Sequence, residues 1–325
     1  MPLKPIIGVD IGGTKILAVV ADSNGKLLAR KHIPTQAASG PEPGIKRIIL
    51  AINQVCRQAN ISSKDGINGI GIAIAGLVDT PRGILVTSPH LPDWRDVPLK
   101  DQLEAALGVQ TFIINDAKAA ALGEQTFGAG KGIENQIYMT VSTGIGGGII
   151  INGALYMGKA GSAGEIGHMV IDVNGPRCNC GNNGCLETLA SGTAVAREMS
   201  ARLGKGDSSI VRDTVSGRLQ DITAEMVSKA AEQGDTVAVE VIHQAGVYLG
   251  VGLANLVNIF NPELIIIGGG FAKVGSRLLD PAISEMKRRA FSRPANQVRI
   301  TVAQLGDNSG VLGAVAYLLN HAEGR

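Results

Sequence analysis

Segment 165–187 concentrates residue types that bind metals. It reads EIGHMVIDVNGPRCNCGNNGCLE and holds one histidine, three of the chain's four cysteines and a glutamate at each end. His168, Cys178, Cys180 and Cys185 follow the spacing H-x9-C-x-C-x4-C, and these are ligand types that suit tetrahedral zinc. Three kinds of site come into question: a zinc site that does chemistry, a zinc site that holds a loop, and a disulfide-rich patch.

The disulfide patch is the least favoured of the three. The cluster has an odd number of cysteines, and nothing in the sequence indicates secretion. The remaining Cys56 lies in a helical stretch, INQVCRQA, where a buried core thiol is expected. Three cysteines and one histidine would complete a tetrahedral shell without a position for water. The metal is therefore expected to be structural and not itself a Lewis acid.

A glycine loop near the N-terminus, GVDIGGTK, resembles the phosphate-binding P-loop without matching it. Thr14 precedes Lys15, the reverse of the P-loop order, and the following KILAVVAD is typical of a strand and not of a helix. A tight turn between antiparallel strands is expected instead. The backbone at Gly12 and Gly13 and the Thr14 hydroxyl could surround a phosphate, and Asp10 could hold hydrated Mg²⁺. An ordinary glycine hairpin is the alternative.

Two further glycine runs extend this nucleotide-binding hypothesis. STGIGGG contains Thr143 and Gly144 and stands at the start of the second half of the chain, where it repeats the design of the first loop. Two such loops facing each other could clamp the phosphates of one nucleotide. LIIIGGG places Gly268, Gly269 and Gly270 at the end of a strand, which is a common place for nucleotide contacts and also the form of any tight strand-to-helix turn.

The elements that must position these residues alternate between strands and helices. Short β-branched runs, each closed by an Asn-Gly turn, predict three antiparallel strands within 5–33 and again within 137–158. This repeat indicates an internal duplication of two related domains. Helices are expected near 44–60, 192–204, 223–233 and 235–259. The alternation predicts an α/β protein with mixed sheets.

Composition and charge exclude several classes of partner. At 325 residues the chain is long enough for two domains, and its net charge of +2 is scattered, so no nucleic-acid footprint is expected. The N-terminus contains neither a secretory apolar region nor a membrane span. The apolar segment 245–260 contains Asn255 and Asn258, so a buried core helix is expected there. A cytoplasmic protein without a membrane partner is therefore predicted.

These motifs together resemble the ROK family of sugar kinases and sugar-responsive repressors. DIGGTK, AGLVD, INDAKAAALGE, STGIGGG, GEIGH, CNCGNNGCLE and IIIGGG occur in the family's order over essentially the whole chain. The resemblance implies the actin-like ATPase, or ribonuclease-H-like, duplication of two α/β domains around an interdomain cleft. It implies an N-terminal domain of 1–117 plus 311–325, because such chains return to the first domain at their end, and a C-terminal domain of 118–310 with the zinc-binding insert.

The resemblance also implies ATP-dependent phosphorylation of a hexose at its terminal hydroxyl, as in bacterial glucokinases. Such a transfer needs a carboxylate that accepts the hydroxyl proton, and it needs Mg²⁺ and backbone donors around the phosphates. Asp116 matches the family's base, and Asn115 matches a sugar-hydroxyl ligand. Without the resemblance, Asp116 would be taken for the cap of the helix that begins there.

Further sugar contacts are implied around the cysteine motif. Glu165, His168 and Glu187 match residues that hydrogen-bond sugar hydroxyls, and Gly76 lies on a loop of the same pocket. With one ring nitrogen on a structural Zn²⁺, His168 would have its other N–H fixed as a donor for the sugar. The expected mechanism is domain closure on sugar and MgATP, followed by proton abstraction by Asp116 and in-line attack on the γ-phosphate.

Two classes of function remain in competition within the resemblance. The repressors carry a winged helix-turn-helix domain before the first glycine loop, and DIGGTK begins here at residue 10, so an enzyme is expected. Kinases for N-acetylmannosamine, N-acetylglucosamine and fructose share these motifs, whereas WRDVPL and GEIGH look most similar to the glucose-specific members. Family members are commonly dimers or tetramers, so a homo-oligomer is expected.

Two residues depart from the family pattern. Many family kinases have NDAN where this chain has NDAK, so Lys118 is expected either to lower the pKa of the base or to point to solvent. Glucose-specific members often have PNL where this chain has Pro89, His90 and Leu91, in a loop near the pocket. This second departure leaves the identity of the sugar open.

Overall fold

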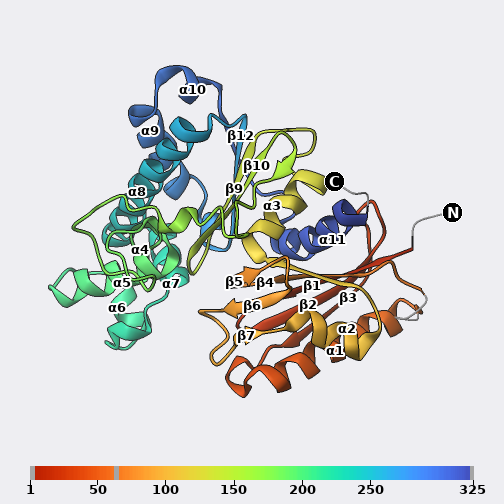
Figure 1. The fold of residues 1–325 in the computed structure, drawn as a ribbon. Coiled ribbons are helices and arrows are strands. Elements are labelled where there is room, and N and C mark those ends of the chain that lie inside the picture. The colour runs from red at the N-terminus through yellow and green to blue at the C-terminus, as the bar shows by residue number, and fades with distance from the viewer. Residues whose placement is uncertain (1–3, 62–65, 323–325) are drawn as a thin grey trace. The chain divides into compact units, whose positions relative to one another are not determined.

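The computed structural model describes residues 4–61 and 66–322, and the chain forms two compact units (Figure 1). Unit one comprises the described residues up to Tyr138, then Gly148–Gly164, and those from Ala303 onward. Unit two comprises Met139–Gly147 and Glu165–Val302. The chain contains two five-stranded sheets of the same design.

The first sheet has five strands in the order β3-β2-β1-β4-β8. Strands β1, β2 and β3 are antiparallel neighbours, and β4 and β8 continue the sheet parallel to β1. The glycine turn between β1 and β2 joins antiparallel strands, so the expected hairpin is confirmed and a P-loop is excluded. The bounds are Ile6–Ile11 (β1), Lys15–Ala21 (β2), Leu27–Pro34 (β3), Ile70–Ile74 (β4) and Thr111–Asn115 (β8).

Helices cover both faces of this sheet because successive strand residues point to opposite sides. Ile7, Val9 and Ile11 of β1 join one core with α1 and α2, whereas Ile6 joins a second core with Val311 and other residues of α11. The helices of unit one are Pro41–Gln58 (α1), Leu99–Leu107 (α2), Asp116–Phe127 (α3) and Ser309–Ala322 (α11). A small antiparallel sheet comprises Leu77–Asp79 (β5), Ile84–Thr87 (β6) and Arg95–Val97 (β7).

Two glycines let α11 lie directly on the first sheet. A Cβ on Gly8 would stand 2.6 Å from the Val311 carbonyl oxygen, and one on Gly71 would stand 2.0 Å from that of Ala314. Any larger side chain would push the helix away. Helix α11 also packs along α3, as the blue and yellow ribbons show in Figure 1. The C-terminal helix is thereby placed beside the end of β1, which carries Asp10, and against α3, which begins with Asp116.

The second sheet repeats the design of the first, with the order β11-β10-β9-β12-β13. In both sheets the first three strands in sequence are followed on the other side by two later ones, and β10–β11 are antiparallel while β12–β13 are parallel. The internal duplication expected from the sequence is therefore confirmed. The bounds are Gln136–Val141 (β9), Ile145–Ile151 (β10), Ala154–Leu155 (β11), Leu264–Gly268 (β12) and Arg299–Val302 (β13).

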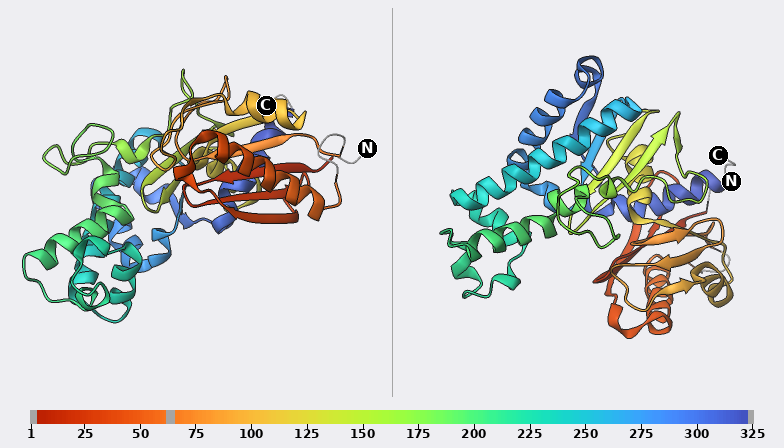
Figure 2. Two further views of the ribbon diagram at one scale, coloured as in Figure 1. Left: turned by 90° about the horizontal axis from the view of Figure 1, so that it is seen from below. Right: turned by 60° about the vertical axis from the view of Figure 1, so that its left-hand side comes forward.

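Seven α-helices belong to unit two. The longest, α8, packs against α4, α5, α7, α9 and α10 (Figure 2). Among the described residues, α8 is the one helix long and apolar enough to span a membrane, but 61% of its apolar window is buried. Gly246 and Gly250 let the carbonyls of α9 approach α8 closely. The expected core helix is confirmed. The helices are Leu186–Ala190 (α4), Gly192–Gly204 (α5), Val211–Thr214 (α6), Ala224–Glu232 (α7), Thr236–Phe260 (α8), Ser276–Arg289 (α9) and Ser292–Gln297 (α10).

The compact units differ from the expected division of 1–117 plus 311–325 against 118–310. Helix α3 packs on α11 and therefore belongs to unit one, as does the segment Gly148–Gly164. The return to unit one begins at Ala303, because the turn before α11 is bonded to Glu124 of α3. The boundaries of the folding domains themselves stay a prediction.

Candidate functional site

Asn115, and not Asp116, is the cap of helix α3. Asn115 has extended backbone geometry (φ −61°, ψ 143°), and its side-chain oxygen accepts the N–H groups of Ala117 at 3.0 Å and Lys118 at 3.1 Å. A cap residue has this conformation and these bonds. Asp116 is the first residue of the helix, so its carboxylate does not have to cap the helix. The alternative role considered for Asp116 is therefore wrong.

The Asn115 side chain also ties the strand end to the loop at Gly76. Its amide nitrogen donates to the Gly76 carbonyl at 3.0 Å and to Asp116 Oδ1 at 3.1 Å. Both donors and both acceptor positions of Asn115 are in use, so a sugar hydroxyl would have to displace one of these partners. Gly76 has φ +137°, and a Cβ there would stand 2.4 Å from the Thr87 carbonyl oxygen. The position therefore requires glycine.

Asp10 and Asp116 lie where the carboxyl ends of the parallel strands β1 and β8 meet. Parallel pairing aligns Asp10 with Ala73 of β4, and Ala73 with Ile114 of β8, so the carboxyl ends of β1 and β8 meet there. Burial, and then the charge of Asp116, raise the pKa of Asp10 to about 7 against the opposing charge of Lys15. Burial likewise raises the pKa of Asp116, opposed by the Ala117 N–H and the charge of His90. Such paired, perturbed carboxylates are typical of a functional site.

The first glycine loop closes beside these carboxylates. The Gly12 N–H donates to the Lys15 carbonyl at 3.0 Å, and Thr35 donates from its hydroxyl to the Gly12 carbonyl at 2.7 Å. A Cβ on Gly13 would stand 2.9 Å from the His90 carbonyl oxygen. The loop that departs from the family pattern at His90 therefore packs directly on the glycine turn. Thr14 and Lys15 are exposed at its tip.

Lys118 lies inside unit one. Its side chain does not point to solvent, since the residue is only 3% exposed and its Nζ donates to the Gly161 carbonyl at 2.7 Å. The charge of His90 is among the causes that lower the pKa of Asp116, and the expected effect of Lys118 on that pKa stays a prediction. The cation is instead used to hold a loop of unit one against α3.

The histidine and the three cysteines of the insert converge in unit two. Their ligand atoms all lie within 4.8 Å of one another, with 3.6 Å between Cys180 Sγ and Cys185 Sγ and 3.6 Å between Cys178 Sγ and His168 Nδ1. Ligands 2.3 Å (sulfur) or 2.0 Å (nitrogen) from a tetrahedral zinc would be separated by about 3.6–3.8 Å. A disulfide would need about 2.05 Å. The residues therefore fit a closed Cys3His zinc shell.

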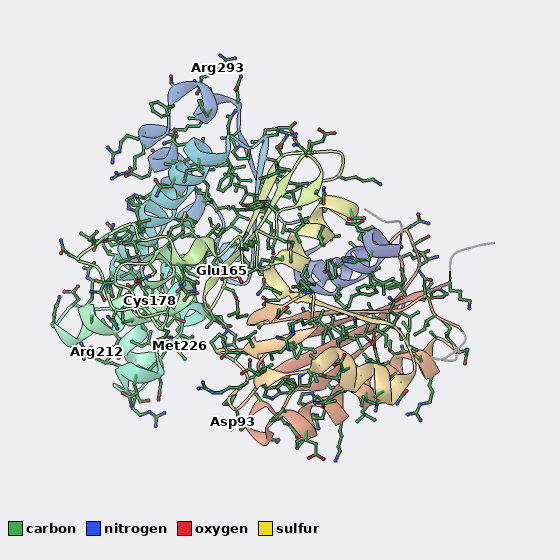
Figure 3. The ribbon with its side chains drawn as sticks, viewed as in Figure 1. Asp93, Glu165, Cys178, Arg212, Met226 and Arg293 are labelled. Carbon is green, nitrogen blue, oxygen red and sulfur yellow. The ribbon has the colours of Figure 1, made fainter. Side chains whose placement is uncertain are left out.

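The local fold of the insert supports this assignment. Isolated β-bridges join Val170 to Cys185 and Arg177 to Asn183, so a short antiparallel turn brings the ligands together. Burial and the neighbouring thiols raise the pKa of Cys185 to about 12, so the thiolate that zinc needs is favoured only beside the metal. Figure 3 labels Cys178 and also Glu165, which precedes the 3-10 turn Ile166–His168.

Glu187 links the cysteine insert to the second glycine loop. Its Oε2 accepts the Ile145 N–H at 2.9 Å, and a Cβ on Gly144 would stand 2.3 Å from the same oxygen. The carbonyl of Thr143 accepts the Thr193 hydroxyl at 2.8 Å, which ties the loop to the start of α5. A predicted sugar contact and a predicted phosphate loop are therefore joined directly in unit two.

The third glycine run lies against the same loop. Gly268 ends β12, and Gly269 has φ +94°, where a side chain would be strained. A Cβ on Gly269 would stand 2.4 Å from the Val141 carbonyl oxygen, and one on Gly270 would stand 3.5 Å from Ser142 Oγ. The predicted site residues thus form two groups. Unit one holds Asp10, Gly12, Gly13, Thr14, Lys15, Gly76, Asn115 and Asp116; unit two holds Thr143, Gly144, Glu165, His168, Cys178, Cys180, Cys185, Glu187, Gly268, Gly269 and Gly270.

The sequence did not indicate the part that the turn before α11 plays in unit one. A Cβ on Gly310 would stand 2.8 Å from Asp10 Oδ2, so the first turn of α11 lies against that carboxylate. Helix N-termini attract negative charge. Glu124 holds this turn in place, because its buried carboxylate accepts the N–H groups of Gln304 and Leu305 and the Ser309 hydroxyl. The GDNSG motif before the last helix was the available signal.

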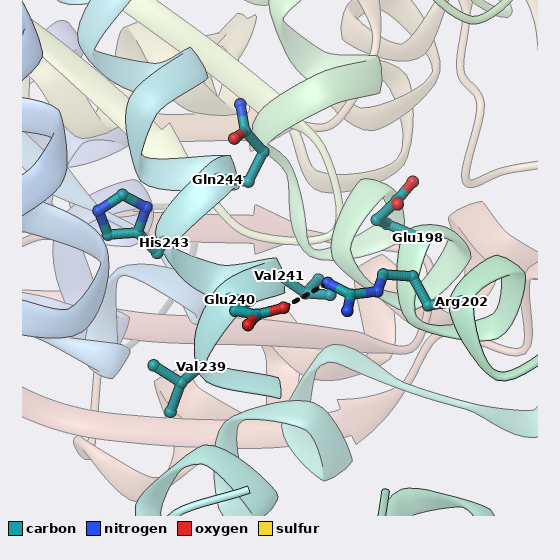
Figure 4. A pocket seen from close by; sticks show the side chains of 7 residues that line it. All are labelled: Glu198, Arg202, Val239, Glu240, Val241, His243 and Gln244. Carbon is teal, nitrogen blue, oxygen red and sulfur yellow. Dashed lines mark hydrogen bonds and ion pairs between the residues drawn. The ribbon is translucent and has the colours of Figure 1, made fainter. Parts of the chain in front are cut away.

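Two surface hollows of unit two lie apart from the predicted residues. One of about 510 Å³ lies between α5 and α8 and is lined by the ion pair of Arg202 with Glu240, 2.7 Å apart (Figure 4). The other, of about 490 Å³, adjoins it and includes Asp172 and Tyr248. No predicted site residue lines either hollow.

The chain resembles known proteins over almost its whole length. A family model described as the ROK family matches residues 6–321. The chain is 36% identical to the glucokinase of Thermotoga maritima over 98% of both proteins, and 33% identical to the xylose repressor of Bacillus subtilis over 97% of this chain and 77% of the repressor. The crystal structure of a ROK family glucokinase from Streptomyces griseus in complex with glucose and AMPPNP matches with a TM-score of 0.82 at 36% identity, covering 95% of this chain and 97% of that one.

The family match covers residues 6–321, a range that contains the glycine loops and the cysteine insert. The expected fold class, an α/β duplication of the actin-like ATPase type, is confirmed by the repeated sheet order and by the match to the ROK glucokinase structure. The chain belongs to the ROK family.

Proposed function

We propose that this protein is an ATP-dependent sugar kinase that phosphorylates glucose at its terminal hydroxyl. The observation that carries the proposal is the state of Asp116, a partly buried carboxyl with a raised pKa that stands at a helix start which another residue caps. A general base works best when its pKa approaches the working pH. The relatives named glucokinase, and the ROK structure with glucose and AMPPNP, support glucose and ATP as the substrates.

In the proposed reaction Asp116 accepts the proton of the sugar hydroxyl. The hydroxyl oxygen then attacks the γ-phosphorus in line, and ADP leaves with the electron pair of the broken P–O bond. Asn115 holds the carboxylate by donating to its Oδ1 at 3.1 Å, and it fixes the Gly76 loop at the same time. Correct placement of the base before the reaction lowers the entropic part of the barrier.

Asp10 is the proposed protein ligand for Mg²⁺. It is a partly buried carboxyl with a pKa raised to about 7, and a cation beside it would restore its charged form. Magnesium is usually held by one or two carboxylates together with substrate phosphates, and it supplies positive charge that stabilises phosphoryl transfer. The first turn of α11, beside Asp10, adds backbone donors to this region.

The glycine loops are the proposed phosphate contacts. Their close turns leave backbone N–H groups without side chains above them, which is the usual form of a phosphate cradle. Gly12, Gly13, Thr14 and Lys15 would serve from unit one, and Thr143, Gly144 and the run at 268–270 from unit two.

We assign the Cys3His cluster to a structural Zn²⁺ that shapes the sugar-binding segment. His168 presents Nδ1 to the cluster, which leaves Nε2 as a donor for a sugar hydroxyl. Glu165 and Glu187 are the proposed carboxylate contacts on either side. Three thiols that must stay reduced suit a cytoplasmic location, and a homodimer or homotetramer stays a prediction that light scattering of purified protein can check.

The proposal is tested with a panel of sugars and MgATP, following the release of ADP. Glucose should give the highest kcat/KM, above mannose, fructose, N-acetylmannosamine and N-acetylglucosamine. Preference for an N-acetylhexosamine would retain the kinase and correct the sugar. Absence of turnover with every sugar, in protein that still binds glucose, would overturn the kinase in favour of a sugar sensor.

A further inference from the structure

Lys118 is a buried cation that the proposed reaction does not use. The residue is 3% exposed, and burying an ammonium group costs several kcal/mol unless strong hydrogen bonds compensate. Its Nζ donates to the Gly161 carbonyl at 2.7 Å, a short, charge-assisted bond across 43 residues of chain. This bond compensates part of the cost of burying the ammonium group.

The loop that contains Gly161 is rich in glycine. Gly158, Gly161 and Gly164 all have positive φ, at +64°, +76° and +87°, so the backbone is unusually permissive at three points. The backbone bonds in 156–164 join Tyr156 to Ile149 and Ala163 to Met157. The ammonium of Lys118 meets this loop near its middle. A tether there restricts the conformations that three glycines would otherwise allow.

The two partners of this hydrogen bond, Lys118 and Gly161, lie close in sequence to proposed catalytic or sugar-binding residues. Lys118 stands two residues after Asp116, and its own N–H is bonded to the Asn115 cap, so its main chain belongs to the turn that carries the base. Gly164, at the end of the loop, is followed directly by Glu165. The path of the loop therefore sets where the sugar-binding segment begins.

We propose that Lys118 is a positioning residue that fixes segment 156–164 through the Gly161 carbonyl and thereby presents Glu165 to the sugar. The inference rests on the proposed kinase function for its effect on catalysis, but not for its effect on the loop. Lys118 has no part in proton transfer. Its loss should weaken sugar binding more than it slows the chemical step.

The test compares Lys118→Met with Lys118→Arg, and uses Lys159→Met, at an exposed lysine of the same loop, as the matched control. Methionine fills a similar unbranched space but donates no hydrogen bond. Lys118→Met should raise KM for glucose about tenfold, which corresponds to about 1.4 kcal/mol, while KM for ATP changes less than about twofold. Amide hydrogen exchange in 156–164 should become faster. Lys118→Arg should restore part of both effects, and the control should change neither.

Wild-type KM for glucose together with wild-type exchange in Lys118→Met would overturn the proposal. So would exchange that rises equally throughout unit one, because that result indicates a general loss of stability. If Lys118→Met does not fold, Lys118→Gln, which keeps a shorter donor, decides the question by the same measurements. If the wild-type protein phosphorylates no sugar, the proposed function fails. The rate of amide hydrogen exchange in residues 156–164 then decides by itself whether Lys118 positions the loop.

Discussion

The Asn115 side chain caps helix α3 and at the same time donates to Asp116 Oδ1 at 3.1 Å. Asn115 therefore caps the helix and orients the neighbouring carboxylate, whose Oδ1 also accepts the Ala117 N–H at 2.9 Å. A carboxylate in the first turn also gains from the helix dipole. In this chain the Ala117 N–H and the charge of His90 oppose the burial that raises the pKa of Asp116.

We expect Asn115→Ala to reduce both stability and turnover. Loss of the cap should cost about 1 kcal/mol in the free energy of unfolding, and release of the Asp116 carboxylate and the Gly76 loop should lower kcat about tenfold or more. Urea unfolding and steady-state kinetics measure the two effects. Asn115→Ser keeps a capping oxygen but cannot reach Gly76, so it should recover stability without recovering kcat. Full turnover in both variants would refute the positioning role.

We expect His90→Asn to move the acid limb of the kcat/KM profile to higher pH. Positive charge at His90 favours the ionised form of Asp116 and lowers its pKa. Without this charge the pKa of Asp116 rises, and the base is then protonated at pH values where the wild-type base is still charged. The expected shift is up to about one pH unit and should shrink in high salt. His243→Asn, at an exposed histidine of unit two, is the control; a shift toward lower pH in His90→Asn would contradict the account.

We expect one zinc ion per chain, held by the Cys3His cluster. Metal analysis of the purified protein should give about one equivalent, and Cys178→Ala, Cys180→Ala or Cys185→Ala should each lower both zinc content and activity. Loss of the metal should leave the sugar-binding segment without its shape. The buried Cys56 supplies the control, because Cys56→Ala should retain the zinc. Full activity in metal-free protein would remove the proposed role of the metal.

We expect Glu124→Gln to destabilise unit one. The carboxylate is fully buried and accepts four hydrogen bonds, from Ala129, Gln304, Leu305 and Ser309. In the variant, an NH₂ group takes the place of one carboxylate oxygen and faces two hydrogen-bond donors. We expect this to lower the free energy of unfolding by on the order of 2–3 kcal/mol. Chemical denaturation measures this cost. Glu134→Gln, at an exposed residue, should be neutral, and a cost below about 0.5 kcal/mol for Glu124→Gln would contradict the assignment.

The repeated sheet was predictable because its signals are local. Asn-Gly turns, β-branched runs and glycine loops determine hairpins within a few residues, and the same pattern occurs twice. The cluster of His168 with three cysteines was predictable for a similar reason, since three of its four residues lie within eight residues of sequence. The sequence also placed a helix start at Asp116. It could not decide which of two adjacent capping residues would cap, because backbone dihedral angles determine that.

The role of Lys118 could not be predicted from the sequence. Its burial depends on Gly161, which lies far along the chain and is placed by the fold of unit one. The grouping of α3 with α11 is equally nonlocal, because it depends on Glu124 meeting a turn 180 residues later. Local propensities determine the elements, whereas such long-range contacts determine which elements pack together.

Asp116→Asn tests the central claim most directly. Asparagine keeps the shape of the carboxylate and the helix start but cannot accept the hydroxyl proton, so folding and sugar binding should persist while the chemical step fails. Calorimetry should give a Kd for glucose within about threefold of the wild-type value, and turnover with MgATP should fall by about 10²–10⁴-fold. Turnover near the wild-type rate in a variant that binds glucose normally would show that Asp116 is not the base.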